Sequence, residues 1–401
     1  MPVKLQRCRV SRRLFCAGLT AALTEVTTSS MFAAVTATPG YALVASVDRK
    51  RILRAVEQYL PLAPQTITAF PSDRNPGGSH DFFSEADYFW PNPADPDEPY
   101  INIDGKSNPA NFQGHRKAMI ALSVHMPALT AAWRLTGTRA YGEHAAAHLR
   151  AWFADPSTRM NPNLEFSQGV RNKTTGRSYG IIDTLHLVEV ARAARFIKEE
   201  FLSPDERKAL DAWFREYLHW LQTSTKGITE GAATNNHGVC WALQVAEFAR
   251  LVEDEDTREA MRVRYKRDLL NQMAVDGSFP RELARTKPYS YSIFNLDVMA
   301  TLCKSLGEPG KDSFSFATGD GRSVCKGMAF LFPYLEDKQR WPYPKDVEHF
   351  DFLPVRAPSL LFCGLACSRP EYLALWKRLD PDPTDPEIIR NYPIRQPLLW
   401  L

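Results

Sequence analysis

From residue 115 onward the sequence is a nearly continuous series of helical patterns with short breaks between them. In segment 116–135, for example, apolar residues recur at the spacing of one helix face. Similar segments are 139–153, 181–201, 237–252, 261–273, 290–306, 319–334 and 357–378. Ser203-Pro204-Asp205-Glu206 starts another helix, because Ser203 can serve as N-cap and Glu206 can close a capping box. Helices of this length joined by short turns pack as antiparallel hairpins.

Several such hairpins in sequence form either a solenoid or a closed toroid. The sequence has no repeat of fixed period like those of helical solenoids. Two segments, 71–114 and 155–180, are also too long for solenoid turns, and long loops in a compact domain usually have a function. We therefore expect an all-α fold, an (α/α) toroid or incomplete barrel of antiparallel helical hairpins whose long loops line a cleft.

Residues 1–37 have the pattern of an export signal. A basic stretch ends in Arg12-Arg13-Leu14-Phe15, and a weakly apolar run continues from there to Val35. Paired arginines ahead of a phenylalanine are typical of a twin-arginine signal. Glu25 interrupts the apolar run, so an unstructured or membrane-anchoring N-terminus is the alternative. We expect a signal at 1–37, a single domain at 38–401, and a periplasmic or secreted mature protein.

The formal net charge of +3 is concentrated in this N-terminal segment, which holds five basic residues and one acidic residue. Without it, the 49 basic and 46 acidic residues of the chain become 44 and 45, a net charge of −1. We therefore expect no nucleic-acid binding, and an anionic partner must be held by a local basic cleft. The mature part contains no run approaching the ~20 apolar residues of a membrane span.

Five cysteines follow the predicted signal, in apolar surroundings: Cys240, Cys303, Cys325, Cys363 and Cys367. They lack the histidine and cysteine partners at the spacing of a zinc site, and no aspartate cluster has the pattern of a calcium loop. We expect no metal and no cofactor. Buried free thiols are the default for such cysteines, and one disulfide is the alternative in an oxidising compartment.

The first motif that can carry chemistry is Thr234-Asn235-Asn236-His237-Gly238, directly before an apolar helix. Two amides, an imidazole and the free N–H groups of a helix start can act together on an anionic group. The alternative is an asparagine N-cap beside a structural histidine.

The second motif runs from Asp276-Gly277, which marks a turn, to Tyr291. It places Arg281, Glu282, Arg285, Tyr289 and Tyr291 close together in the sequence. An arginine can bind a carboxylate through two donors, and a tyrosine can transfer a proton if positive charge lowers its pKa from ~10. A solvated loop with salt bridges is the alternative.

The long loops add aromatic, amide and arginine side chains of the kind that bind acidic sugars. Trp90 stands in Tyr88-Phe89-Trp90-Pro91-Asn92-Pro93, and Gln168, Arg177 and Tyr179 follow in the second loop. For any one of these residues, ordinary loop packing is the more common role.

Five strings in this order resemble the alginate-lyase superfamily: Trp90–Pro93, Tyr100–Pro109, Gly176–Thr184, Asn235–Gly238 and Asp276–Tyr291. The resemblance implies an α/α toroid that degrades alginate or a related polyuronate. Gly238-Val239-Cys240 precede Trp241 where alginate lyases have an aromatic pair soon after the histidine. A related toroidal branch that cuts β-1,4-glucuronan is about equally similar, so the substrate stays open between alginate (polymannuronate) and glucuronan.

The resemblance also implies roles for single residues in a β-elimination that leaves 4,5-unsaturated uronate ends. Asn236 and Arg285 would neutralise the uronate carboxylate, and Tyr291 and His237 would act as acid and base. Further candidates for binding the anionic polysaccharide are Trp90, Gln168, Arg177, Tyr179, Asn235 and Tyr289.

Two other functions compete with this interpretation. A toroidal glycoside hydrolase acting on uronyl oligosaccharides would need paired carboxylates, for which Asp183, Asp276 and Glu282 are candidates. A non-catalytic helical protein that binds sugars would need none of these groups.

Overall fold

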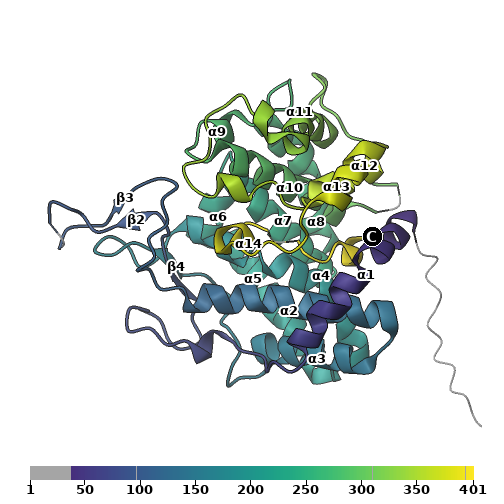
Figure 1. Cartoon of the computed structure of the whole chain (residues 1–401). Helices are drawn as coiled ribbons and strands as arrows, with labels where there is room; N and C mark the ends of the chain where they lie inside the picture. Colours follow the sequence, from purple (N-terminus) through teal and green to yellow (C-terminus); the bar gives the residue numbers. More distant parts are fainter. Residues whose placement is uncertain (1–37, 96, 309, 393) are drawn as a thin grey trace, which may run out of the picture. The chain divides into compact units, whose positions relative to one another are not determined.

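Helices make up most of the computed structural model (Figure 1), which describes residues 38–95, 97–308, 310–392 and 394–401. The predicted export signal lies outside the described residues. The longer helices are α1 (Pro39–Tyr59), α2 (Gly114–Thr136), α3 (Arg139–Leu149), α4 (Leu187–Phe201), α5 (Pro204–Thr223), α7 (Asn236–Leu251), α8 (Glu255–Arg264), α10 (Pro288–Leu306), α11 (Val324–Glu336), α12 (Pro358–Ala366) and α13 (Pro370–Arg378). The short ones are α6 (Thr225–Gly231), α9 (Pro280–Leu283) and α14 (Pro386–Arg390). None of the described helices is long and apolar enough to cross a membrane.

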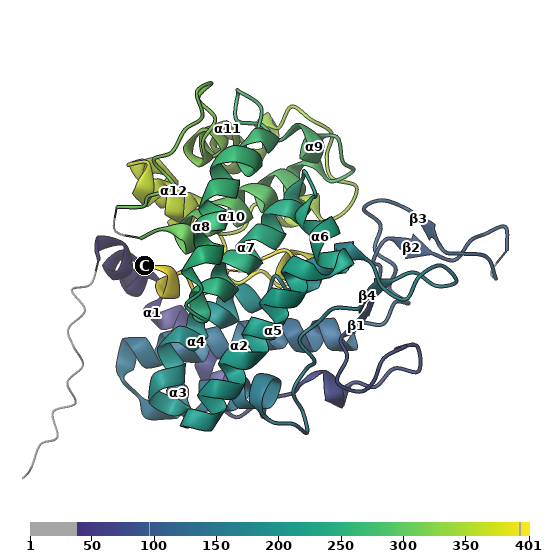
Figure 2. The same ribbon diagram turned by 180° about the vertical axis from the view of Figure 1, so that it is seen from behind.

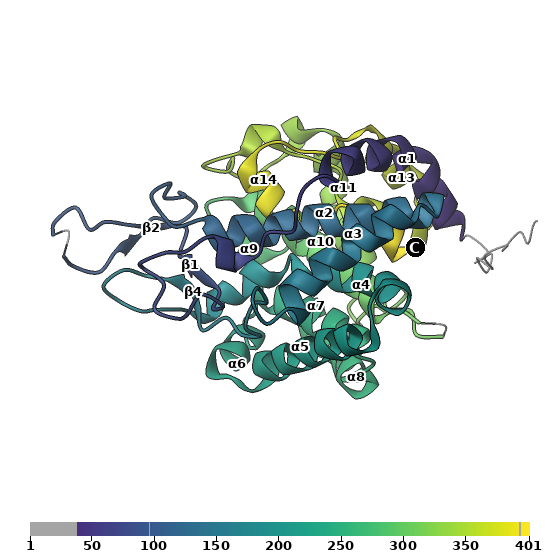
Figure 3. The ribbon, with the colours of Figure 1, turned by 90° about the horizontal axis from the view of Figure 1, so that it is seen from below.

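An inner set of helices forms the wall of the fold. In this set α2 contacts α4, α4 contacts α7, α7 contacts α10, and α10 contacts α12. The helices between them in sequence pack outside, and the view from below shows α5 and α8 outside α7 (Figure 3). Four inner helices pair with the outer helix that follows them in the chain: α2 with α3, α7 with α8, α10 with α11 and α12 with α13. Helix α5 packs against α7. This is the all-α, α/α toroid that the sequence predicts.

The two ends of the described unit, Thr38–Leu401, complete the ring together. Helix α1 contacts both α2 and the C-terminal 3₁₀ turn η8 (Pro397–Trp400). Arg356 donates to Asp48 of α1 at 2.7 Å, and the buried carboxylate of Glu189 on α4 accepts the backbone N–H groups of residues 395 and 396. Burial raises the pKa of Glu189 to about 7. The C-terminal segment is therefore fixed against the inner helices.

The two long segments lie together on one side of the helices, as opposite views show (Figures 1 and 2). They carry short strands: β1 (Phe83–Glu85), β2 (Phe89–Trp90), β3 (Ile101–Asn102) and β4 (Phe166–Gly169). Strand β1 pairs with β4 in parallel, and β2 pairs with β3 in an antiparallel hairpin. Because β1 also contacts α2, this sheet structure is fixed at the end where α2 begins.

Several of the predicted helices have different limits in the structure; segment 319–334, for example, is helical only from Val324. Segment 357–378 is two helices, because Ser368 adopts a φ of 54° and Pro370 cannot continue a preceding helix. Segment 181–201 begins as the 3₁₀ helix η3 (Ser178–Thr184), and α4 starts only at Leu187. The predicted capping box is confirmed, since Ser203 accepts the N–H of Glu206 and Glu206 accepts that of Ser203.

Both states expected for the cysteines, a disulfide and buried free thiols, occur in the structure. Cys325 on α11 and Cys367 at the end of α12 form a disulfide, which closes a loop with a sequence separation of 42. Cys240, Cys303 and Cys363 are buried free thiols. The disulfide thus links the last hairpins of the toroid.

A histidine cluster between α2 and α3 makes stability depend on pH. His148 is buried between His125 and His144, and neither of its ring nitrogens has a hydrogen-bond partner among the described residues. Burial, and then the two other histidines, lower the pKa of His148 from 6.5 to about 3. The unfolded chain therefore binds a proton that the folded protein excludes, and this favours unfolding as the pH falls below 6.5.

We predict that His148→Met removes this part of the pH dependence, because a methionine fills the same apolar site without titrating. Between about pH 7 and about pH 5, the wild-type protein loses about 2 kcal/mol of unfolding free energy through His148. Urea unfolding at a series of pH values measures the difference between the two slopes. His219→Met, at an exposed position on α5, is the matched control and keeps the wild-type slope. Equal slopes for wild type and His148→Met would contradict the prediction.

Candidate active site

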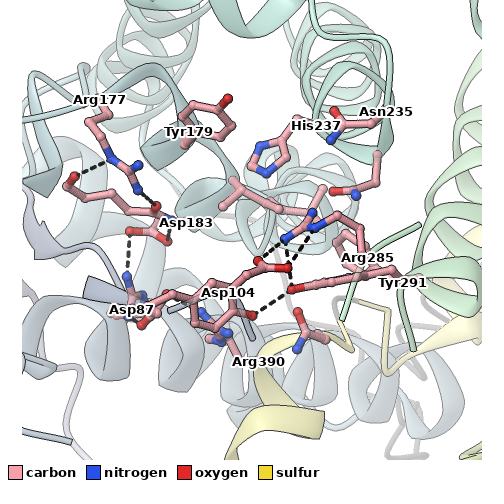
Figure 4. Close-up of a pocket in the computed structure, with 18 of the residues that line it drawn as sticks. Asp87, Asp104, Arg177, Tyr179, Asp183, Asn235, His237, Arg285, Tyr291 and Arg390 are labelled. Carbon is pink, nitrogen blue, oxygen red and sulfur yellow. Dashed lines mark hydrogen bonds and ion pairs between the residues drawn. The ribbon is translucent and has the colours of Figure 1, made fainter. Parts of the chain in front are cut away.

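One cavity of about 460 Å³ collects most of the predicted site residues (Figure 4). Its wall includes the first turns of the inner helices α2, α7 and α10 and the segment before α4. The β2–β3 hairpin, β4 and α14 complete the lining. Because a helix N-terminus presents free N–H groups and a partial positive charge, this end of the toroid suits an anionic ligand.

Asn236 is the first residue of α7 and is fixed by a buried carboxylate. Its backbone N–H and its side-chain Nδ2 each donate to Glu282, both at 2.7 Å. Burial raises the pKa of Glu282, although the two bonds from Asn236 favour the charged form. Asn236 Nδ2 has a second hydrogen to donate. This pair connects the two motifs of the sequence, 234–238 and 276–291.

His237 follows on the same helical turn and has a carboxylate partner of its own. Its Nδ1 lies 2.5 Å from Oε1 of Glu230, which is buried on α6. The Tyr179 ring lies edge-on to the imidazole, with ring centroids 5.0 Å apart. The imidazole faces the cavity (Figure 4), and its Nε2 has no hydrogen-bond partner among the described residues.

Arg285 lines the cavity beside Tyr291 and is paired with Asp104, which follows β3. Its Nη2 donates to Asp104 at 2.7 Å and its Nε at 3.3 Å, whereas Nη1 has no partner in the described chain. Burial opposes the charged form of Asp104, but hydrogen bonds from Arg285 and Thr286 outweigh it and lower the pKa. The guanidinium also stacks on the Tyr291 ring, 4.4 Å from its centroid.

The Tyr291 hydroxyl lies between the hydroxyl of Tyr88, at 2.9 Å, and Nη2 of Arg285, at 3.4 Å. Burial, and then Tyr88, raise the pKa of Tyr291, and Arg285 lowers it by less. Positive charge therefore does not lower the pKa of Tyr291 here, because burial and Tyr88 together outweigh Arg285. Tyr291 holds its proton at neutral pH and is suited to donate it.

A network of buried ion pairs forms another part of the wall. Arg116 donates to Asp87 at 2.6 Å and to Asp183 at 3.2 Å, and Arg390 of α14 pairs with the same Asp87. These arginines are neutralised by carboxylates. They shape the cavity and leave little free charge there.

Arg177 is different, because it forms no ion pair with any residue that the structure describes. Its guanidinium donates to the backbone oxygen of Gln168 at 3.1 Å and to the side-chain oxygen at 2.9 Å. It also lies over the rings of Phe89 and Tyr179, at 4.8 and 5.1 Å from their centroids. Gln168 and Tyr179, both predicted to bind substrate, therefore lie beside Arg177 in the cavity wall. Asn235, the third such residue, lines another part of the same cavity.

Two predicted substrate-binding residues do not line the cavity. Tyr289 is buried on the other side of α10, where its hydroxyl donates to the backbone oxygen of Tyr334. It lies only two residues from Tyr291, so helix geometry turns it away by roughly 200°. Trp90 donates to the backbone oxygen of Lys106, and its strand neighbour Phe89 lines the cavity instead.

The carboxylates that a hydrolase would need all accept hydrogen bonds from other side chains of the protein. Asp183 accepts from Ser84 and Arg116, and Glu282 from Asn236. Asp276 accepts the N–H and hydroxyl of Ser278 in a turn outside the cavity. Within the described chain, no cluster of three or more His, Cys, Asp or Glu side chains is arranged to hold a metal ion.

Gly238, the last residue of the first motif, is required by a close approach. A Cβ at this position would lie 2.0 Å from the carbonyl oxygen of Ala233. Any larger residue would push the start of α7 away from the loop before it. The glycine therefore allows Asn236 and His237 to reach the cavity wall.

Sequence reasoning missed Tyr88, Asp104 and Glu230 as site residues. Tyr88 and Asp104 lie in the quoted strings of the first long loop, but only the path of that loop brings them to Tyr291 and Arg285. Glu230 lies in a short helix with two glycines, Gly227 and Gly231, which gives no helical pattern. Its spacing of seven residues before His237 is the only signal that the sequence offers.

Comparison with known proteins identifies the family. The family model described as alginate lyase matches residues 66–341. An alginate lyase from Bacteroides ovatus has a similar structure, with a TM-score of 0.77 and 28% identity over 90% of this chain and 97% of that chain. An alginate lyase of Sphingomonas species A1 aligns with a TM-score of 0.53 and 16% identity, over 92% of this chain and 97% of that one.

A histidine-to-alanine variant of the Sphingomonas enzyme, complexed with a tetrasaccharide, aligns with a TM-score of 0.56 and 15% identity, over 90% of this chain and 95% of that chain. No curated protein matches the sequence. Because the family model spans more than half of the chain, and the fold agrees with it, this protein belongs to the alginate lyase family and is a polysaccharide lyase.

Proposed function

We propose that this lyase cleaves a β-1,4-linked uronic-acid polymer, alginate (polymannuronate) or glucuronan, by β-elimination in the cavity at the start of α7 and α10. The observation that carries the proposal is the convergence of Asn236, His237, Arg285 and Tyr291 on that one cavity. They supply a neutral donor, an imidazole, a guanidinium and a phenol, the groups that the reaction needs.

The first requirement is to neutralise the uronate carboxylate. The C5 proton is hard to remove while the adjacent carboxylate is anionic, because its removal adds a second negative charge. Asn236 Nδ2 and Arg285 Nη1 are the donors left over after Glu282 and Asp104 are satisfied. Directed at the carboxylate, they stabilise the enolate-like charge that develops there. Each is held by a carboxylate partner, so little reorganisation is needed.

The second requirement is a base for the C5 proton and an acid for the leaving oxygen. His237 Nε2 accepts the C5 proton, and the electrons of the C5–H bond form the C4–C5 double bond. The C4–O4 bond breaks with its electrons on O4, which takes the proton of Tyr291. Transfer of the proton from His237 back to the tyrosine, through water, restores both groups. The raised pKa of Tyr291 supports its role as the acid.

The polymer is bound mainly by side chains that contact sugars other than the reacting one. Arg177, stacked between Phe89 and Tyr179, is free of carboxylate partners and suits a second uronate along the chain. The tetrasaccharide complex of the Sphingomonas enzyme supports an oligosaccharide-length ligand for this fold.

We predict that Tyr291→Phe lowers turnover by about 10²–10⁴-fold and leaves polymer binding largely intact, because only the proton donor is lost. Ultraviolet absorbance of the unsaturated uronate measures turnover, and calorimetry measures binding. Tyr289→Phe, the buried neighbour outside the cavity, is the matched control and keeps wild-type turnover. Full activity of Tyr291→Phe would remove the tyrosine from the mechanism.

To identify the substrate, the wild-type protein is incubated with each polymer separately, and the ultraviolet absorbance of the unsaturated uronate is followed. We expect a rising signal with polymannuronate or glucuronan and none with hyaluronan. If Tyr291 served as both acid and base, His237→Gln would keep its turnover on these polymers. If the folded wild-type protein gave no absorbance increase with any polyuronate, the proposed function would be contradicted.

We further propose that residues 1–37 export the protein to the periplasm or the medium. The disulfide between Cys325 and Cys367 supports an oxidising destination. In fractionated cells that express the full chain, we expect the mature protein outside the cytoplasm, and retention inside for an Arg12→Lys, Arg13→Lys variant. Equal export of both proteins would argue against the twin-arginine route.

A further inference from the structure

Glu230 is a buried carboxylate for which the proposed reaction has so far given no role. It lies on α6, 2% exposed, and its one hydrogen bond among the described residues is to Nδ1 of His237. No lysine or arginine forms an ion pair with it in the described chain. Burial of a charge costs free energy unless the charge is well paired. A carboxylate whose partner is an imidazole is therefore unusual for a purely structural residue.

We propose that Glu230 is a positioning residue for catalysis. It holds the His237 proton on Nδ1 and so presents an unprotonated Nε2 to the substrate. This inference rests on the proposed function, in which His237 is the base. A carboxylate only accepts hydrogen bonds, so the imidazole nitrogen beside it must carry the hydrogen. The neutral ring then has its lone pair on Nε2, the nitrogen that faces the cavity.

The same contact supports the reaction after the proton has moved. When Nε2 accepts the C5 proton, the ring becomes a cation, and the Glu230 carboxylate 2.5 Å away stabilises it. Other charged and titratable groups face the imidazole from the surrounding elements: Tyr179 on η3, Glu282 on α9 and Arg285 beyond α9. Of these elements, α6 alone supplies a direct hydrogen bond to the ring.

Glu230 is also separable from the fixation of the backbone. Glu282 holds the start of α7 through the backbone N–H of Asn236, whereas Glu230 touches only a side chain. Replacement of Glu230 by the isosteric glutamine therefore removes the charge and the fixed acceptor while α7 stays in place. A glutamine can also donate to Nδ1, and this would put the ring hydrogen on Nε2 and block the base.

The kinetic test compares wild type, Glu230→Gln, His237→Ala and the double variant on the polymer that the wild-type protein cleaves. We expect Glu230→Gln to lower kcat by about 10- to 100-fold with KM changed by less than about 2-fold. In the double variant, loss of Glu230 adds nothing to the loss caused by His237→Ala.

Glu165→Gln is the matched control. Glu165 anchors the other end of α6 through Lys226, at 2.5 Å, and does not line the cavity. We expect its kcat to equal that of wild type, so a general disturbance of α6 would show as equal losses in both glutamine variants. Wild-type kcat in Glu230→Gln, or a further loss in the double variant, would overturn the inference.

A direct measurement needs no variant enzyme to be active. Nitrogen NMR of histidine-labelled wild-type protein, with His237→Ala to assign the signal, reports which ring nitrogen carries the hydrogen. A protonated Nδ1 supports the inference, and a neutral ring protonated on Nε2 overturns it. This result is independent of turnover: a protein inactive on all polyuronates would contradict the proposed function alone.

Discussion

The hydrogen bonds between Glu282 and Asn236 are the contact on which the site depends. A helix that starts in a cavity wall leaves N–H groups without partners, and the side chain of the residue before α7, Asn235, does not cap it. Glu282 takes this role from another segment of the chain, through one backbone and one side-chain bond. The bonds fix Asn236 and His237 relative to the segment that carries Arg285 and Tyr291. Without Glu282, the buried start of α7 would lack this acceptor.

The charge of the cavity is local and largely compensated. Arg116 and Arg390 are neutralised by aspartates and glutamates, and Arg285 shares its charge with Asp104. Of the arginines that line the cavity, only Arg177 lacks a carboxylate partner within the described chain. In the proposed function, the nearly neutral segment 38–401 recognises an anionic polymer through single donors at fixed places and not through a strong overall field.

The sequence predicted the toroid because helix length and short turns leave few other arrangements, and it predicted the four central residues because their motifs keep a fixed order. The sequence was a poor guide where a residue's role depends on the direction in which its side chain points or on how deeply that side chain is buried. Helix spacing already separates Tyr289 from Tyr291, and strand alternation separates Trp90 from Phe89. The pKa of Tyr291 depends on how deeply the ring lies in the folded protein, and no motif encodes that depth.

The partners of the central residues were harder to predict. Asp104 is 181 positions from Arg285, so their ion pair depends on the path of a long loop with little regular structure. Glu282 was visible in its motif but was considered as a hydrolytic acid, because its contact with Asn236 spans 46 positions. Side chains that hold other side chains in place leave little pattern in a single sequence.

A crystal structure of Tyr291→Phe with a bound tetra-uronate tests the central claim most directly. The account predicts one uronate carboxylate within hydrogen-bond distance of Asn236 Nδ2 and Arg285 Nη1, with C5 facing His237 Nε2 and the glycosidic oxygen beside residue 291. An oligosaccharide whose carboxylates contact Arg177 alone, with no sugar between Asn236 and Arg285, would contradict it.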